Sequence, residues 1–240
     1  MFFRQILHEE KACASYLIGC PSMGVCAVVD PQGDPDVYVH QVEDNAMVIQ
    51  AVVETHVHAD HLSCARDLSA LIGAPLYLGS AARVAFEYSP LADGQVVTIG
   101  NRHIRTLHTP GHTPEHVSLV VDDWFVLTGD TLFVGDVGRV DLALDDVPFQ
   151  VVRARASLLY ESLQRLLALS EWTEVYPGHY AGSVCGQGMD GKPVTTIGRE
   201  RRCNPTFQLS QEAFVSKIAE RMLPLPADFH AIKRRNSGWQ

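Results

Sequence analysis

Short apolar runs separated by turn residues fill the first third of the chain. The runs at 14–18 and 25–29 predict a β-hairpin, and a strand over 47–54 follows a weakly helical connection. Apolar positions at helical spacing then predict a helix over 63–72, before a further short strand at 75–78. This β-loop-α-β order is typical of an α/β sheet, in which functional sites lie at the carboxyl ends of strands.

The remaining pattern alternates between strands and helices. Short β-prone runs predict strands at 95–99, 102–107, 117–121, 124–127 and 174–176, with Trp124 and Phe125 in the core. Helices are predicted over 151–169, 195–202 and 211–222, and an extended segment over 223–226. Because no internal repeat or low-complexity linker interrupts this pattern, we expect one domain over residues 1–240.

Composition and charge exclude some classes of protein for this chain. The chain has 240 residues, 46% of them hydrophobic, and a formal net charge of −9, which argues against nucleic-acid and anionic-membrane partners. No apolar run has the length of a membrane span, and no secretory signal precedes the first strand. Six scattered cysteines without a Cys-x-x-Cys pair favour free thiols in a reducing compartment, so we expect a cytoplasmic protein.

Candidate metal ligands are concentrated in the segment 55–61. His56, His58, Asp60 and His61 follow directly on the strand predicted over 47–54. Imidazole and carboxylate groups together suit zinc, iron or manganese. A polar turn that is rich in histidine by chance is the competing interpretation, and four residues of ligand type at this spacing disfavour it. The segment therefore predicts a metal site.

Three further residues of ligand type follow other predicted strands. His112, Asp130 and His179 each lie in a loop that contains glycine, which allows the backbone to approach a metal closely. Seven side chains in all are therefore candidates for metal binding.

The complete series, His56-x-His58-x-Asp60-His61 followed by His112, Asp130 and His179, resembles the metal ligands of the metallo-β-lactamase superfamily. The resemblance implies an α/β fold, a four-layer αβ/βα metallo-β-lactamase sandwich, with the site at one edge of two sheets. It further implies, for dinuclear members, one metal held by His56, His58 and His112. The second metal would be held by Asp60, His61 and His179, with Asp130 bridging.

Further motifs are similar to the persulfide dioxygenase (sulfur dioxygenase) branch of that superfamily. They are Phe3-Arg4-Gln5, Gly129-Asp130, Gly138-Arg139-Val140-Asp141, and Glu200-Arg201-Arg202-x-Asn204-Pro205. Residues 176–179 and 182–186 look most like the form that is fused elsewhere to a rhodanese domain, although no rhodanese domain is expected within these 240 residues.

This narrower resemblance implies one Fe(II) per chain, held by His56, His112 and Asp130. Two histidines and a carboxylate form the facial triad of non-haem iron oxygenases, which leaves coordination positions open for substrate and O2. The remaining four residues, His58, Asp60, His61 and His179, would belong to a second site or support the first.

The implied activity is the oxidation of glutathione persulfide, or another low-molecular-weight persulfide, with O2 to sulfite and thiol. Arg139 would bind a substrate carboxylate through its guanidinium group. Cys185 is either a small buried hydrophobe or a thiol that handles sulfur near the metal. Tyr180 stands where relatives often have Asp or Gly, so its role is open.

Two other functions compete with the oxygenase. A thioester hydrolase of the glyoxalase II type (hydroxyacylglutathione hydrolase) would use two zinc ions or mixed metals and the same glutathione pocket. A non-catalytic sulfur carrier or sensor would use Cys185, and the complete ligand set argues against this function. A separate sulfurtransferase as partner and a homo-oligomer are also expected. His116 is interpreted as an ordinary turn residue and Cys64 as core.

Overall fold

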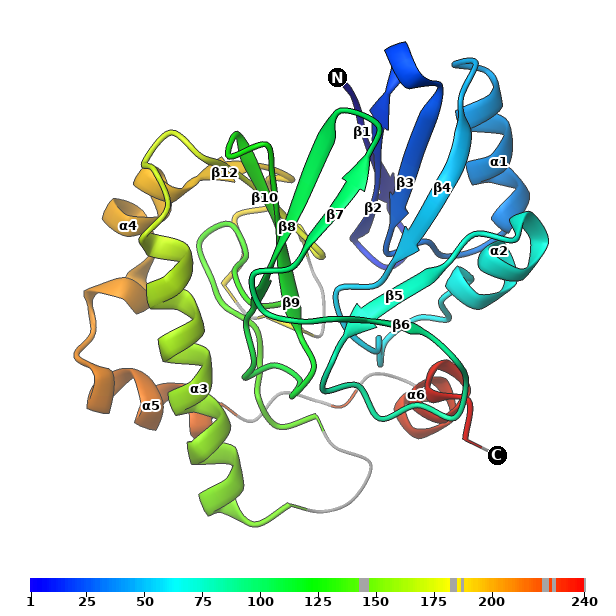
Figure 1. Cartoon of the computed structure of the whole chain (residues 1–240). Helices are drawn as coiled ribbons and strands as arrows, with labels where there is room; N and C mark the ends of the chain where they lie inside the picture. The colour runs from blue at the N-terminus through cyan, green and yellow to red at the C-terminus, as the bar shows by residue number, and fades with distance from the viewer. Residues whose placement is uncertain (143–146, 182–184, 187, 222–224, 226–227, 240) are drawn as a thin grey trace.

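Two six-stranded sheets lie face to face, with helices along their outer faces (Figure 1). The structure is a computed structural model. It describes residues 1–142, 147–181, 185–186, 188–221, 225 and 228–239. This arrangement of two sheets and six α-helices within the described residues confirms the predicted four-layer α/β sandwich.

The first sheet follows the order of the chain. Strands β1 to β3 are antiparallel, and β3 to β6 are parallel. Helices α1 and α2 connect the parallel strands, and α2 ends at Gly73, whose φ of 69° suits a residue without a side chain. The elements of this half are β1 (Phe2–His8), β2 (Cys13–Cys20), β3 (Val25–Val29), α1 (Pro35–Glu43), β4 (Val48–Val53), α2 (Ala65–Ile72), β5 (Leu76–Gly79) and β6 (Ser89–Leu91).

The second sheet has the order β12-β11-β10-β9-β8-β7. Among the strand pairs that the described residues form in this sheet, only β10–β11 is parallel, and α3 connects these two strands. Its elements are β7 (Val96–Ile99), β8 (Arg102–His108), β9 (Val117–Val121), β10 (Phe125–Gly129), α3 (Phe149–Leu167), β11 (Glu174–Pro177), β12 (Thr195–Thr196), α4 (Ile197–Cys203) and α5 (Gln211–Ala219). The last helix, α6 (Phe229–Ser237), lies below β5 and β6 of the first sheet in Figure 1.

Successive side chains of a central strand point to opposite faces of the first sheet, and both faces are buried. Tyr16 and Ile18 pack between the two sheets, whereas Leu17 packs in the layer of α1 and α2. A strand that is apolar at successive positions can serve two layers at once. The hydrophobic runs that predicted these strands are therefore the core of the sandwich.

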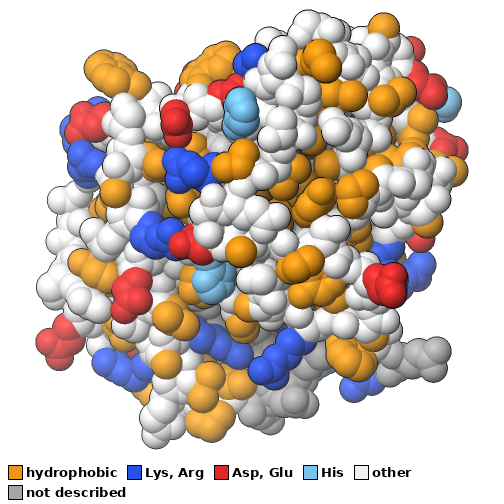
Figure 2. All heavy atoms as spheres, in the orientation of Figure 1, with side chains coloured by type: hydrophobic (Ala, Val, Ile, Leu, Met, Phe, Trp, Pro, Cys, Tyr) orange, Lys and Arg blue, Asp and Glu red, His pale blue; other side chains and the backbone are white. Residues whose placement is uncertain are grey.

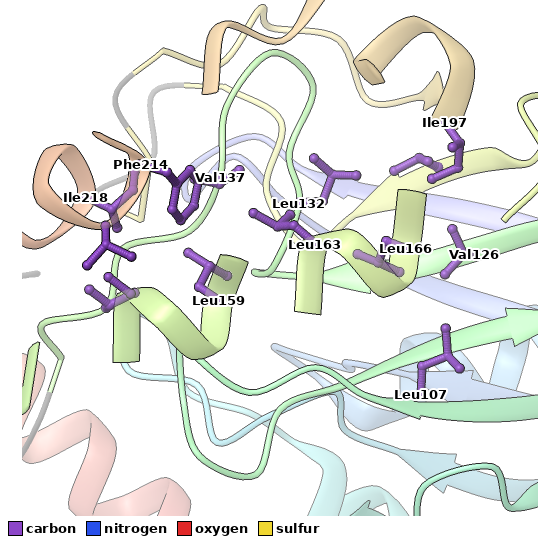
Figure 3. Close-up of a cluster of buried hydrophobic side chains, with 14 of the residues drawn as sticks. Leu107, Val126, Leu132, Val137, Leu159, Leu163, Leu166, Ile197, Phe214 and Ile218 are labelled. Carbon is purple, nitrogen blue, oxygen red and sulfur yellow. The ribbon is translucent and has the colours of Figure 1, made fainter. Parts of the chain in front are cut away.

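The outer layer of the second sheet also anchors the loop that follows β10. Figure 3 shows Leu159 and Leu163 of α3 in one cluster with Phe214 of α5 and with Leu132 and Val137 of that loop. Truncating a buried leucine of this kind costs about 2–5 kcal/mol, so the cluster holds the loop firmly. The loop begins at a predicted ligand, and the helical layer therefore contributes to positioning the site.

Some predicted elements differ from the observed ones. Strand β1 and helix α6 were not predicted, because β1 is only half-buried and α6 has a low mean hydropathy. Trp124 was wrongly placed in the core: it is 54% exposed, because β10 begins at the buried Phe125. The extended segment predicted at 223–226 lies, except for residue 225, outside the described residues, as does the last residue of the helix predicted over 211–222.

The surface carries charges of both signs. Figure 2 shows Lys and Arg side chains interspersed with Asp and Glu side chains over the face it presents. Among the described residues, none of the helices is both long enough and apolar enough to cross a membrane.

Candidate metal centre

The seven predicted ligands lie in four loops that follow strands. One segment, 56–61, follows β4, and His112 lies between β8 and β9. Asp130 and His179 follow the parallel neighbours β10 and β11. All seven side chains are buried, with at most 6% of any residue exposed. The structure therefore gathers residues far apart in sequence into one enclosed polar centre.

A first group consists of His56, His112 and Asp130, whose ligand atoms all lie within 4.8 Å of one another. The Oδ2 atom of Asp130 is 3.5 Å from Nε2 of His112 and 3.9 Å from Nε2 of His56. Two imidazole nitrogens and one carboxylate oxygen thus converge on a common point. This is the donor set of the predicted facial triad.

Hydrogen bonds determine which nitrogen of His56 faces this point. The Thr55 hydroxyl donates to Oδ2 of Asp30 at 2.8 Å and also lies 2.9 Å from Nδ1 of His56. Because a hydroxyl has one hydrogen, Nδ1 of His56 must donate to Thr55. The Nε2 lone pair of His56 is therefore free to bind a metal.

His112 is oriented in the same way by a backbone group. Its Nδ1 atom lies 2.8 Å from the carbonyl oxygen of Arg139, which can only accept. Nε2 of His112 consequently carries the lone pair. Burial lowers the pKa of both His56 and His112, so both imidazoles are held in the neutral form that a metal requires.

His116 positions Asp130 and is not the ordinary turn residue that was expected. It is completely buried, and its Nε2 atom accepts a hydrogen bond from the backbone nitrogen of Asp130 at 3.0 Å. Nδ1 lies 3.0 Å from the Thr109 hydroxyl and 3.1 Å from the Thr131 hydroxyl. Burial, the main cause, and the neighbouring His112, the second, lower the pKa of His116 to about 3. The ring therefore stays neutral, and Nε2 remains available as an acceptor.

Two glycines permit the close packing around Asp130. A Cβ atom at position 138 would lie 1.9 Å from the carbonyl oxygen of Asp130, and one at position 178 would lie 2.6 Å from Oδ1. Both positions accept only glycine without displacement of the carboxylate or its backbone. The glycine of the Gly138-Arg139 motif is thus required for packing against Asp130, in addition to being part of a recognisable sequence motif.

A second group contains Asp60, His61 and His179. Nε2 of His179 lies 2.8 Å from Oδ2 of Asp60, and Nδ1 of His179 lies 2.7 Å from Oδ1 of Asp130. His61 is held by Asp60, with 3.2 Å between Nδ1 and Oδ1. His179 therefore connects the two groups. Burial alone would lower the pKa of His179, but the carboxylates of Asp130 and Asp60 outweigh it and raise the pKa well above its ordinary value.

His58 contacts a carboxylate outside both groups. Its Nε2 atom is 3.3 Å from Oδ1 of Asp30, at a geometry too poor for a hydrogen bond. Burial opposes the charged form, but Asp30 raises the pKa of His58 to about 9. His58 thus has a different environment from His56 and His112. In a dinuclear site, these three histidines would bind the same metal.

Unsatisfied polar atoms show that these residues suit a metal ion. Among the described residues, four of the seven buried side-chain atoms without a hydrogen-bond partner belong to the ligand set: both ring nitrogens of His58, Nε2 of His61 and Oδ2 of Asp130. A buried polar atom without a partner costs roughly 1–3 kcal/mol, and a bound cation would remove that cost. The residues therefore fit the metal that their sequence pattern predicts.

Helix α6 holds the ligand loop from its outer side. The Asn236 amide nitrogen donates to the carbonyl oxygens of His58 at 2.9 Å and His61 at 2.8 Å. Its amide oxygen accepts from the backbone nitrogen of Ser63 at 3.1 Å, and Phe229 of the same helix clusters with Ala59. No sequence signal marked Asn236, because the helix that carries it was not predicted.

Two cavities lie beside the ligand loop. One of about 540 Å³ reaches Asp60 and His61 and is also lined by Lys11 and Arg235. The other, of about 580 Å³, is lined by Glu115 and by the cations Arg83, Arg155 and Lys233. Both are large enough for a small-molecule ligand.

The predicted substrate residue Arg139 is buried. It is 1% exposed, and its Nε and Nη2 atoms donate to the two carboxylate oxygens of Asp141 at 2.6 and 2.7 Å. Its role in binding substrate is untested and stays a prediction. What the structure adds is the contact of its carbonyl oxygen with His112.

The cysteines expected near the site and in the core are both buried. The Sγ atom of Cys185 lies within 4.8 Å of ligand atoms of Asp60 and His179. Cys64 packs in the cluster beneath α2, as predicted, and it precedes that helix rather than lying within it. Residues 182–184 of the predicted sulfur-handling loop lie outside the described residues.

Comparison with known proteins gives one family. A model of the metallo-beta-lactamase superfamily matches residues 9–179. The chain is 28% identical to the beta-lactamase hydrolase-like protein of Xylella fastidiosa over 84% of this chain, and it spans about half (52%) of that relative's length.

Two other relatives match over most of both sequences and carry different activities. The hydroxyacylglutathione hydrolase of Maricaulis maris is 27% identical, over 98% of this chain and 99% of the relative. The human mitochondrial persulfide dioxygenase ETHE1 is 28% identical, over 94% of this chain and 84% of the relative.

Two solved structures are similar over nearly the whole chain. ETHE1 from Myxococcus xanthus has a TM-score of 0.86 at 30% identity and covers 100% of both chains. A metallo-beta-lactamase from Staphylococcus aureus has a TM-score of 0.90 at 28% identity and covers 98% of this chain and 72% of that one.

Proposed function

Since this chain belongs to the metallo-β-lactamase superfamily, we propose that it is an iron-dependent persulfide dioxygenase. It would oxidise glutathione persulfide, or another low-molecular-weight persulfide, with O2 to sulfite and thiol. The observation that carries this proposal is the convergence of Nε2 of His56, Nε2 of His112 and Oδ2 of Asp130. Two imidazoles and one carboxylate are the donor set that oxygenases use for Fe(II).

Similarity over full length supports this choice within the superfamily. The Myxococcus xanthus ETHE1 structure and this chain cover each other completely, and the human persulfide dioxygenase ETHE1 matches most of this chain. Every part of this chain therefore has a counterpart in the Myxococcus xanthus structure.

The residues of this chain would prepare the site for that reaction. His56 and His112 present neutral Nε2 atoms, because Thr55 and the Arg139 carbonyl oxygen each engage the opposite nitrogen. Asp130 supplies the negative donor, and His116 fixes its backbone. Bound Fe(II) would supply the redox chemistry and the open coordination positions. Burial of the whole ligand set would limit the access of water to the reacting sulfur.

The cavities support a small anionic thiol derivative as substrate. The cavity of about 580 Å³ brings Arg83, Arg155 and Lys233 together, and these cations suit the carboxylates of glutathione. Its Glu115 accepts a hydrogen bond from the backbone nitrogen of Val57 at 3.0 Å, between two ligand histidines. A substrate bound there would therefore lie directly beside the ligand loop.

The second ligand group favours one competing function. Asp60, His61 and His179 are all present, and Asp60 contacts both histidines. A dinuclear centre would use these three residues for its second metal. A hydroxyacylglutathione hydrolase is also similar along almost the entire chain. The alternative is a glyoxalase II-type hydrolase, in which two zinc ions or mixed metals activate water against a thioester.

One experiment separates these two activities. The purified protein would be loaded with Fe(II) under anaerobic, reducing conditions, and O2 uptake would be measured with glutathione persulfide. The same preparation, and one loaded with zinc, would be assayed for hydrolysis of an S-acyl glutathione thioester. Uptake of O2 with formation of sulfite supports the dioxygenase. Thioester hydrolysis without O2 uptake would replace it with the hydrolase.

Cys185 offers a finer test of the same proposal. Its thiol lies near Asp60 and His179, so a role in handling sulfur predicts slower turnover, or a changed ratio of sulfite to thiosulfate, in Cys185→Ser. Iron content should not change. Kinetics and products equal to those of the wild type would assign Cys185 to packing alone.

Other expectations stay predictions. They are the binding of a substrate carboxylate by Arg139, a role for Tyr180, a single domain over 1–240, a separate sulfurtransferase partner, a homo-oligomer and a cytoplasmic location.

A further inference from the structure

A thiol lies beside the second ligand group, and no motif had marked it. Cys13 is the first residue of β2, is 2% exposed, and has its Sγ atom within 4.8 Å of ring nitrogens of His61 and His179. Three side chains of ligand type therefore meet at this point, and none of them belongs to the group of His56, His112 and Asp130.

The backbone fixes this juxtaposition. Cys13 and His179 form an isolated antiparallel bridge between the start of β2 and the loop after β11. The nitrogen of Ala14 donates to the oxygen of Gly178 at 2.9 Å, and the nitrogen of Tyr180 donates to the oxygen of Ala12 at 3.0 Å. Main-chain bonds on both sides of the pair thus hold the thiol against His179.

The surroundings of Cys13 are polar, unlike those of Cys26 and Cys64. Cys26 and Cys64 pack within the hydrophobic cluster under α1 and α2, whereas Cys13 belongs to none of the hydrophobic clusters formed by the described residues. The amide nitrogen of Gln32 donates to its Sγ atom at 2.8 Å. The sulfur is therefore placed as an acceptor, as a thiolate ligand would be.

A second observation at this position points to a missing ligand. His61 is 5% exposed, and its Nε2 atom has no hydrogen-bond partner among the described residues. Its Nδ1 atom is already engaged by Asp60. A buried imidazole nitrogen left open beside a thiol and a second imidazole is the arrangement that a bound cation completes.

We propose that Cys13, His61 and His179 form a thiolate-containing metal position that binds a thiophilic divalent cation such as Zn²⁺. Binding would form the metal–sulfur bond and release the thiol proton to solvent. His179, whose two ring nitrogens both lie against carboxylates, would also release one ring proton as it exchanges a carboxylate contact for the metal. The centre would then contain two unlike positions, one with nitrogen and oxygen donors and one that includes sulfur. This proposal does not depend on which reaction the first position catalyses.

Cobalt spectroscopy provides the direct test, because Co²⁺ occupies zinc positions and bonds to thiolate give a sulfur-to-cobalt charge-transfer band in the near ultraviolet. Metal-free protein would be titrated anaerobically with Co²⁺. We expect the charge-transfer band in the wild type and its loss in Cys13→Ala. The weaker visible bands from the group of His56, His112 and Asp130 should remain in that variant.

Two variants serve as controls. Cys64→Ala removes a buried cysteine that packs among apolar residues, and it should retain the band. Cys185→Ala should also retain it. Absence of the band in the wild type, its persistence in Cys13→Ala, or its loss in Cys185→Ala alone would each overturn the assignment to Cys13.

A measurement without substitution at position 13 covers the case in which Cys13→Ala does not fold. Zinc X-ray absorption on the wild type and on Cys185→Ala should show a sulfur neighbour at ~2.3 Å. A shell of nitrogen and oxygen alone in either protein would overturn the proposal. Since neither experiment involves persulfide or O2, the failure of this proposal is distinguishable from the failure of the proposed dioxygenase activity.

Discussion

At the scale of single residues, hydrogen bonds prepare the two ligand groups differently. The imidazoles of the first group, His56 and His112, have one nitrogen engaged by a neighbour and the other directed toward Asp130. In the second group, His179 lies between two carboxylates. A cation can therefore enter the first position without breaking a hydrogen bond of its two imidazoles, whereas the second requires His179 to release Asp60 or Asp130.

This difference predicts unequal effects on iron binding. His112→Ala removes a donor of the first group and should reduce bound iron to background. His61→Ala alters only the second group and should retain most of it. Iron per chain, measured by elemental analysis after anaerobic loading and desalting, checks the prediction. Equal losses in the two variants would contradict a mononuclear site at the first group.

His116 predicts a pH dependence of the metal-free protein. Its pKa falls from its ordinary value near 6.5 to about 3 on folding, because burial and then His112 disfavour its charged form. Between these two values the unfolded chain binds the additional proton, so stability decreases as the pH falls. The decrease attributable to His116 should be about 2 kcal/mol from pH 7.5 to pH 5.

Urea unfolding of the metal-free wild type and of His116→Gln at both pH values measures this contribution. Gln can still accept from the backbone nitrogen of Asp130 but does not titrate. The decrease in the free energy of unfolding should be smaller in the variant by that amount. The same decrease in both proteins would show that His116 is not the group responsible.

The sequence revealed ligands far more readily than the residues that orient them. His56, His58, Asp60 and His61 are recognisable because metal ligands cluster after a strand. His116 has no such spacing, and its function depends on the fold bringing β10 beside it. Thr55 and Asp30 act through hydrogen bonds that bridge 25 positions of sequence, which a single sequence does not disclose.

At the scale of elements, α6 contributes most to the site after the loops themselves. It lies apart from the helical layers, below β5 and β6 in the view of Figure 1. Asn236 provides all of its amide hydrogen-bonding groups to the loop between His58 and Ser63. The loop thereby acquires partners for backbone groups that neither sheet can reach.

Removal of that amide should loosen the ligand loop. Asn236→Ala would leave the carbonyl oxygens of His58 and His61 without this donor, at a cost of about 1–3 kcal/mol. Faster amide hydrogen exchange over 58–63 and faster iron dissociation are expected. Asn45→Ala, which removes one bond to the Gln41 carbonyl oxygen at the end of α1, is the matched control. Unchanged exchange over 58–63 in Asn236→Ala would refute this role.

Periodicity explains which elements were predictable. The spacing over 151–169 identified α3, since Val152, Ala156, Leu159, Leu163 and Leu166 all face the core. Helix α6 buries only Phe229, Asn236 and Ser237, so its apolar positions are too few to define a face. Strand β1 forms the edge of its sheet and is only partly covered, which weakens its signal in the same way.

At the scale of the whole molecule, the centre joins the two halves of the sandwich. The segment 56–61 belongs to the first sheet, and His112, Asp130 and His179 belong to the second. A metal bound by both sets is a cross-link that exists only in the folded chain. Its binding free energy therefore contributes to folding stability.

Iron removal should consequently lower the thermal stability of the entire chain. At a free metal concentration one hundred times the dissociation constant, the gain is about 2.7 kcal/mol, or roughly 5–10 °C in Tm for a protein of this size. Calorimetry under anaerobic conditions, before and after treatment with a chelator, measures the shift. His112→Ala should show no shift, and a wild-type Tm that is independent of metal would contradict a site shared by both sheets.

The position of Asn236 also has a consequence for how a nascent chain acquires its metal. Every predicted ligand, including His179, leaves the ribosome before the residue that supports the carbonyl oxygens of His58 and His61. At ~5–20 residues per second, the ligands wait several seconds for that support during translation. A ribosome-bound chain arrested after His179 has left the exit tunnel, but before residue 236 has done so, would carry a complete set of donors on an unsupported loop. Cations would therefore exchange more freely there than in the finished protein.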